Sequence, residues 1–137
     1  MVTGSCFCGN IKISYSGEPV GQATCHCLDC RKISGSAYST NFVVPEDGFK
    51  VTQGTPKTIS KTGDSGNTIT SHFCGDCGTT LFREGAAFAG ARIVKAGVLD
   101  DYDALNKAKP KAELYVKHRA NWVPETPGAQ QNEAGLS

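Results

Sequence analysis

Seven cysteines constrain this chain more than any other feature, because they gather into three short groups. The groups are a CxC pair, a CxCxxC segment and a CxxC pair: Cys6 and Cys8; Cys25, Cys27 and Cys30; Cys74 and Cys77. Zinc binds sulfurs about 2.3 Å away, and cysteines one or two residues apart in a tight turn direct their sulfurs toward a common point. Closed structural zinc sites use four protein ligands, whereas open sites use three. The count and spacing therefore predict two zinc sites of different kinds.

A disulfide framework is the competing interpretation of the cysteines. Their number is odd, and 7 in 137 residues is about 5%, below the roughly 8–10% typical of disulfide scaffolds. A CxC pair would close a strained ring, and the first residues, MVTGSCFC, lack the apolar stretch of a secretory signal. Metal binding is favoured, and with it a reducing compartment, the cytoplasm or the nucleus. Of these two, we expect a cytoplasmic location.

Length and charge limit the possible functions. The chain has 137 residues, 39% of them hydrophobic, which suits one domain with a modest core. Its 14 Lys and Arg residues nearly balance 13 Asp and Glu residues, and the net charge of +1 creates no field that would recruit nucleic acid or an anionic membrane. No apolar run approaches the roughly 18 residues that span a bilayer. We expect a soluble protein without nucleic-acid or membrane partners.

Short β patterns separated by turns occupy most of the chain. Residues 11–15 alternate apolar and polar side chains, as a half-buried strand does, and Gly17 and Pro19 follow them. Further segments rich in Val, Ile, Thr and aromatic residues predict strands at 37–44, 49–53, 57–61, 68–73, 79–83, 92–98 and 113–119. The pattern predicts a mainly β fold.

Helix and disorder are expected in only a few places. The sequence predicts one or two helical turns at 28–33 and a short helix at 101–107, which Pro110 closes off. Residues 1–123 are interpreted as a single domain. The tail at 124–137 has too few apolar residues to pack, so we expect it to be disordered.

The CxxC pair lies in the strongest local motif, FCGDCG. Gly78 allows the backbone to turn so that amide N–H groups point at the sulfurs and stabilise their charge, as in a zinc knuckle. A redox role would require a βαβ context and a helix that starts at the motif, whereas β-forming residues flank it. Together with the CxC pair it predicts a four-thiolate structural site that closes a loop of about seventy residues.

The CxCxxC segment lies in TCHCLDCRK. Three thiolates occupy three corners of a tetrahedron and leave the fourth to water, a substrate thiolate or an outside ligand. His26 is an alternative fourth ligand, although we favour a ring that points away from the metal. Arg31 and Lys32 either offset the negative charge and attract an anionic substrate or, as we favour, form a solvated face. A second structural site, completed by a distant group, is the remaining alternative.

Several other residues near these motifs are candidates for supporting roles. His72 is expected either to face the three-cysteine site or to pair across a strand, and both options are open. His118 is expected to be a structural residue of a strand, and Trp122 to pack as an apolar anchor. Three residues after the CxCxxC segment are expected to line a pocket: Ser34, Ser36 and Tyr38.

Together the motifs resemble the glutathione-dependent formaldehyde-activating family, which includes the centromere protein V relatives. The shared order is CxC, CHCxxC, FCxxCG followed by Leu-Phe, AGVLDD at 96–101 and LYVKHRANW at 114–122. The resemblance spans about Gly4 to Trp122. It implies an Mss4-like fold, in which a structural zinc bridges short antiparallel sheets. It also implies that two sets of cysteines bind zinc, a structural set of Cys6, Cys8, Cys74 and Cys77 and a catalytic set of Cys25, Cys27 and Cys30.

The resemblance also implies an activity. The family's named reaction condenses formaldehyde with glutathione to S-hydroxymethylglutathione, which is carbon–sulfur lyase chemistry. The expected function is therefore a zinc enzyme that acts on a thiol adduct of an aldehyde or another electrophile, for instance in secondary metabolism. The alternative is a non-catalytic, zinc-stabilised binding or chaperone module, since Mss4-like folds also serve as chaperone-like partners. The expected partner is a small thiol or its adduct, and the sequence does not indicate an oligomeric state.

Overall fold

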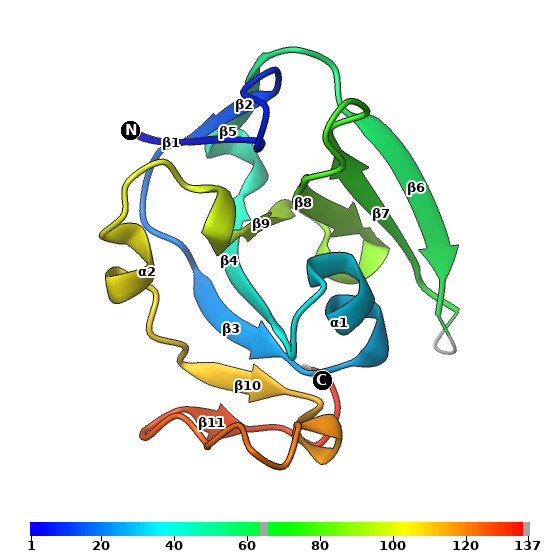
Figure 1. The fold of residues 1–137 in the computed structure, drawn as a ribbon, viewed down its shortest axis with the longest axis vertical. Coiled ribbons are helices and arrows are strands. Elements are labelled where there is room, and N and C mark those ends of the chain that lie inside the picture. Colours follow the sequence, from blue (N-terminus) through cyan, green and yellow to red (C-terminus); the bar gives the residue numbers. More distant parts are fainter. Residues whose placement is uncertain (64–65, 136–137) are drawn as a thin grey trace.

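Two β-sheets make up the fold in the computed structural model, which describes residues 1–63 and 66–135. The small sheet has the strand order β1-β2-β5, and the large sheet has the order β11-β10-β3-β4-β9-β8-β7-β6 (Figure 1). The strands are β1 Val2–Ser5, β2 Lys12–Tyr15, β3 Gly21–Cys25, β4 Ser39–Pro45, β5 Phe49–Gln53, β6 Lys57–Thr62, β7 Thr68–Phe73, β8 Thr80–Gly85, β9 Ala91–Lys95, β10 Ala112–Leu114 and β11 Gln130–Gln131. The prediction of a mainly β fold is confirmed.

Helices are short, as the sequence predicts. The α-helices are α1 Leu28–Ser34 and α2 Ala104–Lys107, and 3₁₀ turns are η1 Glu46–Gly48, η2 Ala86–Phe88, η3 Ala96–Val98 and η4 Val116–His118. Helix α1 begins at Cys27, whose side chain accepts the Cys30 amide N–H, and ends at Gly35, which has a left-handed backbone with φ of 66°. In residues 1–63 and 66–135, no helix has both the length and the apolar character needed to cross a membrane.

The core lies on one face of the large sheet. Phe42 of β4 pairs with Val94 of β9, which in turn pairs with Phe82 of β8, so the three side chains share a face. Ile13 of the small sheet and Leu81 are fully buried in the same cluster. Burial of this apolar face holds the two sheets together.

The opposite face of the large sheet is also buried but polar. Its side chains, here called the polar face, are Ser39, Asn41, Ser71, Arg83 and Lys95, each no more than 9% exposed. Helix α1 lies against this face, where the Ser39 hydroxyl donates a hydrogen bond to the Cys30 sulfur. The ion pair of Asp29 with Lys61 of β6, at 2.7 Å, ties the other side of the helix to the edge of the sheet.

The predicted strand at 113–119 is wrong beyond Leu114. Tyr115 adopts a left-handed backbone, with φ of 54° and ψ of 44°, which ends β10 and starts η4. His118 is therefore exposed in a 3₁₀ turn rather than part of a strand. Trp122 is 75% exposed and does not pack as an anchor. The alternation of residue types predicted a longer strand, because a residue pattern does not indicate where a single residue adopts a left-handed backbone.

The segment after Pro124, expected to be disordered, contains a strand within its described part. Strand β11 pairs in parallel with β10, which itself runs parallel to β3. The buried Glu113 carboxylate accepts hydrogen bonds from the Thr126 amide N–H at 2.9 Å and from the Gln131 side chain at 2.9 Å. These polar contacts, rather than apolar burial, hold the segment, which is why its composition did not predict it.

Candidate metal centres

Four cysteines from distant parts of the chain meet between the two sheets. Cys6 and Cys8 follow β1, and Cys74 and Cys77 follow β7. Their four sulfurs, here called the four-cysteine cluster, all lie within 4.8 Å of one another. The Cys8 sulfur is 3.6 Å from that of Cys6 and 3.7 Å from that of Cys74. Tetrahedral zinc with bonds of about 2.3 Å places sulfurs roughly 3.8 Å apart, so this donor set fits zinc.

Backbone groups around the four-cysteine cluster stabilise thiolates. The Ile11 amide N–H donates to the Cys6 sulfur at 3.2 Å. Gly78, directly after Cys77, has φ of 81°, the left-handed turn that the motif predicted. The Thr79 hydroxyl, followed by the Thr79 amide N–H, lowers the pKa of Cys77 to about 5. Thiolates are the form that zinc binds.

The other three cysteines meet at the start of α1. Cys25 ends β3, Cys27 caps the helix and Cys30 lies in its first turn. Their sulfurs, here called the three-cysteine cluster, also lie within 4.8 Å of one another. Within residues 1–63 and 66–135, no His, Cys, Asp or Glu joins them as a fourth member of the group. The donor set therefore fits a zinc ion with one position left for an outside ligand.

The three thiols share their protons unequally. Hydrogen bonds from Cys25 and then Cys27 lower the pKa of Cys30 to about 2, against the effect of burial. The hydrogen bonds with Cys27 and Cys30 raise the pKa of Cys25. The Cys30 amide N–H donates to the Cys27 sulfur at 3.3 Å. The cluster thus carries one thiolate readily, and metal binding displaces the remaining protons.

Two buried cations lie on the polar face beside the three-cysteine cluster. The Lys95 ammonium donates to the Asn41 side-chain oxygen at 2.7 Å, and the Arg83 Nε donates to the Ser71 hydroxyl at 3.0 Å. Burial lowers the pKa of Lys95, while the charge on Cys30 acts in the opposite direction. Sequence reasoning missed both cations. It considered Arg31 and Lys32 and favoured a solvated face for them, and both are exposed on α1.

His26 lies between Cys25 and Cys27 in the sequence, but its side chain interacts with Glu113 and does not join the cysteine sulfurs. Its side chain is fully buried, and its Nε2 is 3.0 Å from the Glu113 carboxylate. Its ring lies 5.2 Å from that of Tyr38, and its Nδ1 has no hydrogen-bond partner among the described residues. The His26 ring is therefore a buried link between the CxCxxC segment and Glu113 of β10, and it is not solvated.

His72 lies on the core face, away from both cysteine clusters. Its ring stacks on Phe82 with a centroid distance of 4.2 Å, and its Nε2 is 3.6 Å from the Glu84 carboxylate. Of the two options left open by the sequence, the structure places His72 in a cross-strand pair. Neither group of candidate ligands includes it among residues 1–63 and 66–135.

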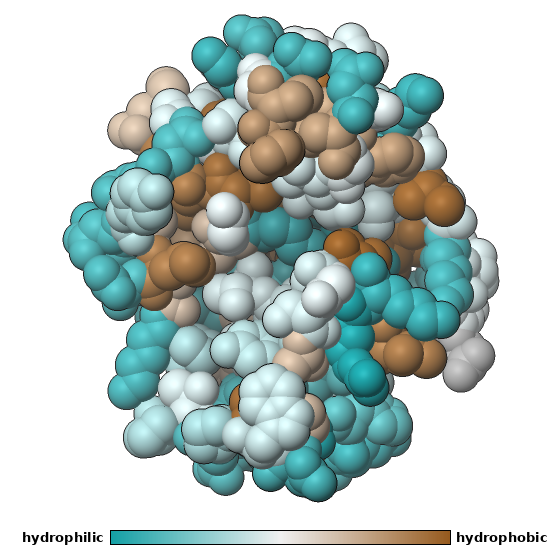
Figure 2. Space-filling view, viewed as in Figure 1, coloured by the Kyte–Doolittle hydropathy of each residue, from teal (hydrophilic) through white to brown (hydrophobic). Residues whose placement is uncertain are grey.

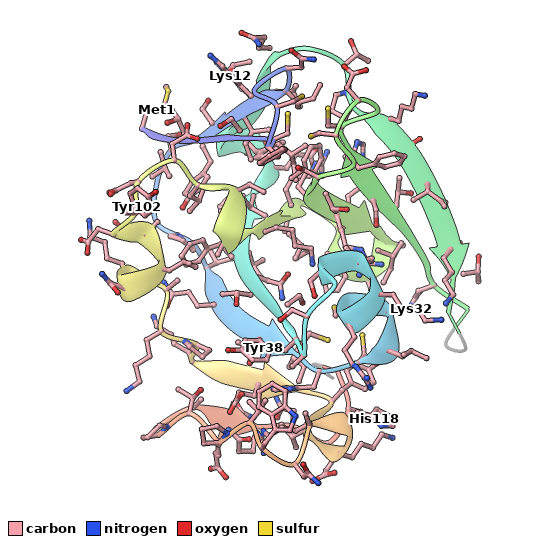
Figure 3. The ribbon with its side chains drawn as sticks, in the orientation of Figure 1. Met1, Lys12, Lys32, Tyr38, Tyr102 and His118 are labelled. Atoms are coloured by element: carbon pink, nitrogen blue, oxygen red, sulfur yellow. The ribbon has the colours of Figure 1, made fainter. Side chains whose placement is uncertain are left out.

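A cavity of about 270 Å³ lies on the core side of β3 and β10. Tyr38 lines it together with Thr24 and Glu113, so one of the three predicted pocket residues lies there. The other two cap the helix, because the Ser34 hydroxyl donates to the Cys30 carbonyl at 2.7 Å and accepts the Ser36 amide N–H. Figure 3 shows Lys32 at the outer edge of α1 and Tyr38 near β10.

Comparisons with known proteins show a family and a similar fold. The model of the glutathione-dependent formaldehyde-activating enzyme family matches residues 1–118. A crystal structure of a protein from Rhodobacter sphaeroides has a similar fold, with a TM-score of 0.62 and 16% sequence identity, covering 79% of this chain and 96% of that chain. No curated protein sequence matches the chain.

Proposed function

Because the chain belongs to the glutathione-dependent formaldehyde-activating enzyme family, we propose that it is a zinc-dependent enzyme of carbon–sulfur lyase type. Its reaction makes and breaks the bond between a thiol and an aldehyde or a similar electrophile. The observation that carries the proposal is the three-cysteine cluster, which no fourth candidate ligand completes among residues 1–63 and 66–135. Three protein ligands and an open position are typical of catalytic zinc.

The residues of the three-cysteine cluster and its surroundings have different roles in this reaction. Cys25, Cys27 and Cys30 would hold the zinc, which would supply an open position for an outside sulfur and would favour its thiolate form near neutral pH. The amide N–H of Cys30 and the hydroxyl of Ser39 fix the sulfurs in place. The reaction needs no oxidant or reductant, because the thiol sulfur bonds to the carbonyl carbon while the thiol proton moves to the carbonyl oxygen.

The four-cysteine cluster is assigned a structural role in this proposal. Its four sulfurs complete a tetrahedron, so it has no position for substrate. Metal binding at both clusters needs reduced thiols, which supports a reducing compartment, and the proposal assigns the enzyme to the cytoplasm. The rival function is a zinc-stabilised binding or chaperone module, in which the three-cysteine cluster accepts no outside sulfur.

Cobalt substitution distinguishes these two functions. We expect glutathione, added to the cobalt-loaded protein, to increase the sulfur-to-cobalt charge-transfer absorbance, because a new sulfur joins the three-cysteine cluster. In a Cys27→Ser variant this increase should be lost, while the absorbance of the four-cysteine cluster is retained. Binding should weaken as the pH falls, since the incoming sulfur must be deprotonated. If glutathione, cysteine and 2-mercaptoethanol all leave the spectrum unchanged, the enzyme function is wrong and the binding module is favoured.

A further inference from the structure

We propose that Lys95 and Arg83 bind a carboxylate of the substrate, so that the enzyme prefers thiols that carry a carboxylate close to the sulfur. This inference rests on the proposed function and narrows its substrate class. Lys95 and Arg83 lie on strands that are distant in sequence from the three cysteines.

The register of the large sheet places both cations on the face that carries the three-cysteine cluster. Cys25 pairs with Ser39, and two residues further along β4, Asn41 pairs with Lys95 of β9. Arg83 of β8 pairs with Ser71 of β7 and with Ile93, which lies two residues before Lys95. Residues that pair across strands, or that lie two apart on one strand, share a face. The polar face therefore runs without a break from the cysteines to the cations.

Among the described residues, neither cation is paired with a carboxylate. Lys95 and Arg83 are each 9% exposed, and in residues 1–63 and 66–135 neither forms an ion pair with a carboxylate. Their hydrogen-bond partners are the neutral side chains of Asn41 and Ser71. Lysine and arginine are almost never buried unless they are paired, because an unpaired buried charge is costly. The polar face thus favours an anionic group that no carboxylate of residues 1–63 and 66–135 supplies.

The charge of the loaded three-cysteine cluster accounts for only one of the two cations. Zinc with three thiolates carries a net charge of −1, whereas Lys95 and Arg83 together carry +2. Lys95 interacts electrostatically with all three cysteines and with Arg83. One positive charge beyond the need of the metal site is left on the polar face. An anionic group of the substrate would compensate it.

The free donors on the two cations suit carboxylate oxygens. An ammonium has three N–H donors and a guanidinium has five, and one of each is used within the described part of the chain. Carboxylates accept such charge-assisted hydrogen bonds strongly, while sulfur is a weak acceptor. Figure 2 shows a hollow with a hydrophilic floor near the centre of the view, where Figure 1 has α1 on one side and η3 on the other. In this proposal, the substrate approaches the polar face through this hollow beside α1.

Binding of matched thiols to the full-length, cobalt-loaded protein tests the inference. Mercaptoacetate and its methyl ester differ in one negative charge, and the charge-transfer absorbance reports the binding of either sulfur. We expect mercaptoacetate to bind at least about tenfold more tightly than the ester, which corresponds to one charge-assisted hydrogen bond. The preference should fall below about twofold in Lys95→Met and Arg83→Met variants. Arg31→Gln, which removes an exposed cation from α1, is the matched control and should keep the preference.

The outcomes separate the inference from the proposed function. If the ester binds the wild type as tightly as the acid does, the cations do not bind a carboxylate, yet the proposed function stands. If neither thiol binds, the proposed function itself fails. If the preference for mercaptoacetate persists in both Met variants but disappears in Arg31→Gln, the exposed Arg31 causes the preference and the inference is wrong. If a Met variant does not fold, as shown by its melting curve, Lys95→Arg and Arg83→Lys replace it and should retain the preference.

Discussion

The two cysteine clusters offer a metal the same donor atom, the cysteine sulfur, but differ in how far apart in the sequence their cysteines lie. In the four-cysteine cluster, sulfurs of residues 66 positions apart lie 3.7 Å from each other, and they join the small sheet to the large sheet. In the three-cysteine cluster, all ligands come from residues 25–30. A metal that closes a long loop constrains the whole unfolded chain, whereas one that binds a single turn constrains little. The first cluster is therefore suited to stability and the second to chemistry.

The surroundings of the two clusters also differ, since neutral groups surround one cluster and a buried charge lies beside the other. The four-cysteine cluster is surrounded by neutral donors, such as the Ile11 amide and the Thr79 hydroxyl, and its Cys8 is exposed. Each cluster has two buried cysteines, Cys6 and Cys74 in one and Cys25 and Cys30 in the other, but the three-cysteine cluster has the charged Lys95 nearby. Charges placed in a buried site act strongly on a reacting group, while exposed ones are screened. This contrast leads to three predictions.

The largest expected effect comes from removing one ligand of each cluster. Cys77→Ser should abolish cooperative unfolding or solubility, because binding of structural zinc contributes about 10–16 kcal/mol in small metal-dependent domains. Cys27→Ser should remain folded, since its cluster links only one local turn. Thermal unfolding and zinc analysis measure both effects, with two zinc ions expected per wild-type chain and one in Cys27→Ser.

Equal loss of folding in both variants would contradict the comparison, because the three-cysteine cluster would then also be structural. A zinc content of one that survives in Cys77→Ser but not in Cys27→Ser would reverse the assignment of the two clusters.

A smaller effect, confined to the region of the three-cysteine cluster, is expected for Glu113→Gln. Burial opposes the charge on Glu113, but hydrogen bonds from the Thr126 amide and Gln131, among others, lower its pKa to about 2 from the ordinary 4.5. The carboxylate therefore stabilises the fold above pH 4.5 by about 3 kcal/mol, and this contribution is lost as the pH falls toward 2.

The measurement is the difference in urea unfolding free energy between the wild type and Glu113→Gln at several pH values. A difference is required because zinc release at low pH affects both proteins. We expect the difference to shrink steadily below pH 4.5, with the zinc content unchanged at pH 7. A difference that is the same at pH 7 and pH 3 would show that the charge of Glu113 does not matter.

The smallest effect compares two glycines that have matched backbones. Gly78 follows the four-cysteine cluster and Gly35 follows α1, with φ of 81° and 66°, and a Cβ at either position would meet no atom within 4 Å. Alanine at each should cost about 1–2 kcal/mol through backbone strain alone. Only Gly78→Ala should also speed the removal of zinc from the four-cysteine cluster by a chelator.

Gly97→Ala is the control for this pair, because Gly97 lies in η3 with open space and without a left-handed backbone. It should change neither stability nor zinc release. If Gly35→Ala releases zinc from the four-cysteine cluster as quickly as Gly78→Ala, the two clusters are coupled more closely than their separation along the chain suggests.

Strands were predicted accurately where the local sequence has a clear β pattern and were missed where it does not. Strands β5 and β7 have the predicted bounds, because Val, Ile, Thr and aromatic residues alternate within them. Strands β1 and β3, VTGS and GQATC, were not predicted, since small and polar residues dominate both. They form because neighbouring strands pair with them, and β3 lies between β4 and β10. Pairing supplies the hydrogen bonds that side-chain propensity does not indicate.

The grouping of the candidate ligands was predictable from the sequence, whereas the residues around them were not. Spacing alone divided the seven cysteines into the two sets whose sulfurs the structure brings together, because cysteines one or two residues apart share a turn wherever the chain places it. The cations beside one set depend on strand register, which joins Asn41 to Lys95 across 54 residues. The contact between the buried Glu113 and Gln131 of β11 also depends on strand register. Local spacing is a property of the sequence, but register is fixed only when distant strands pair and bury one face of a sheet.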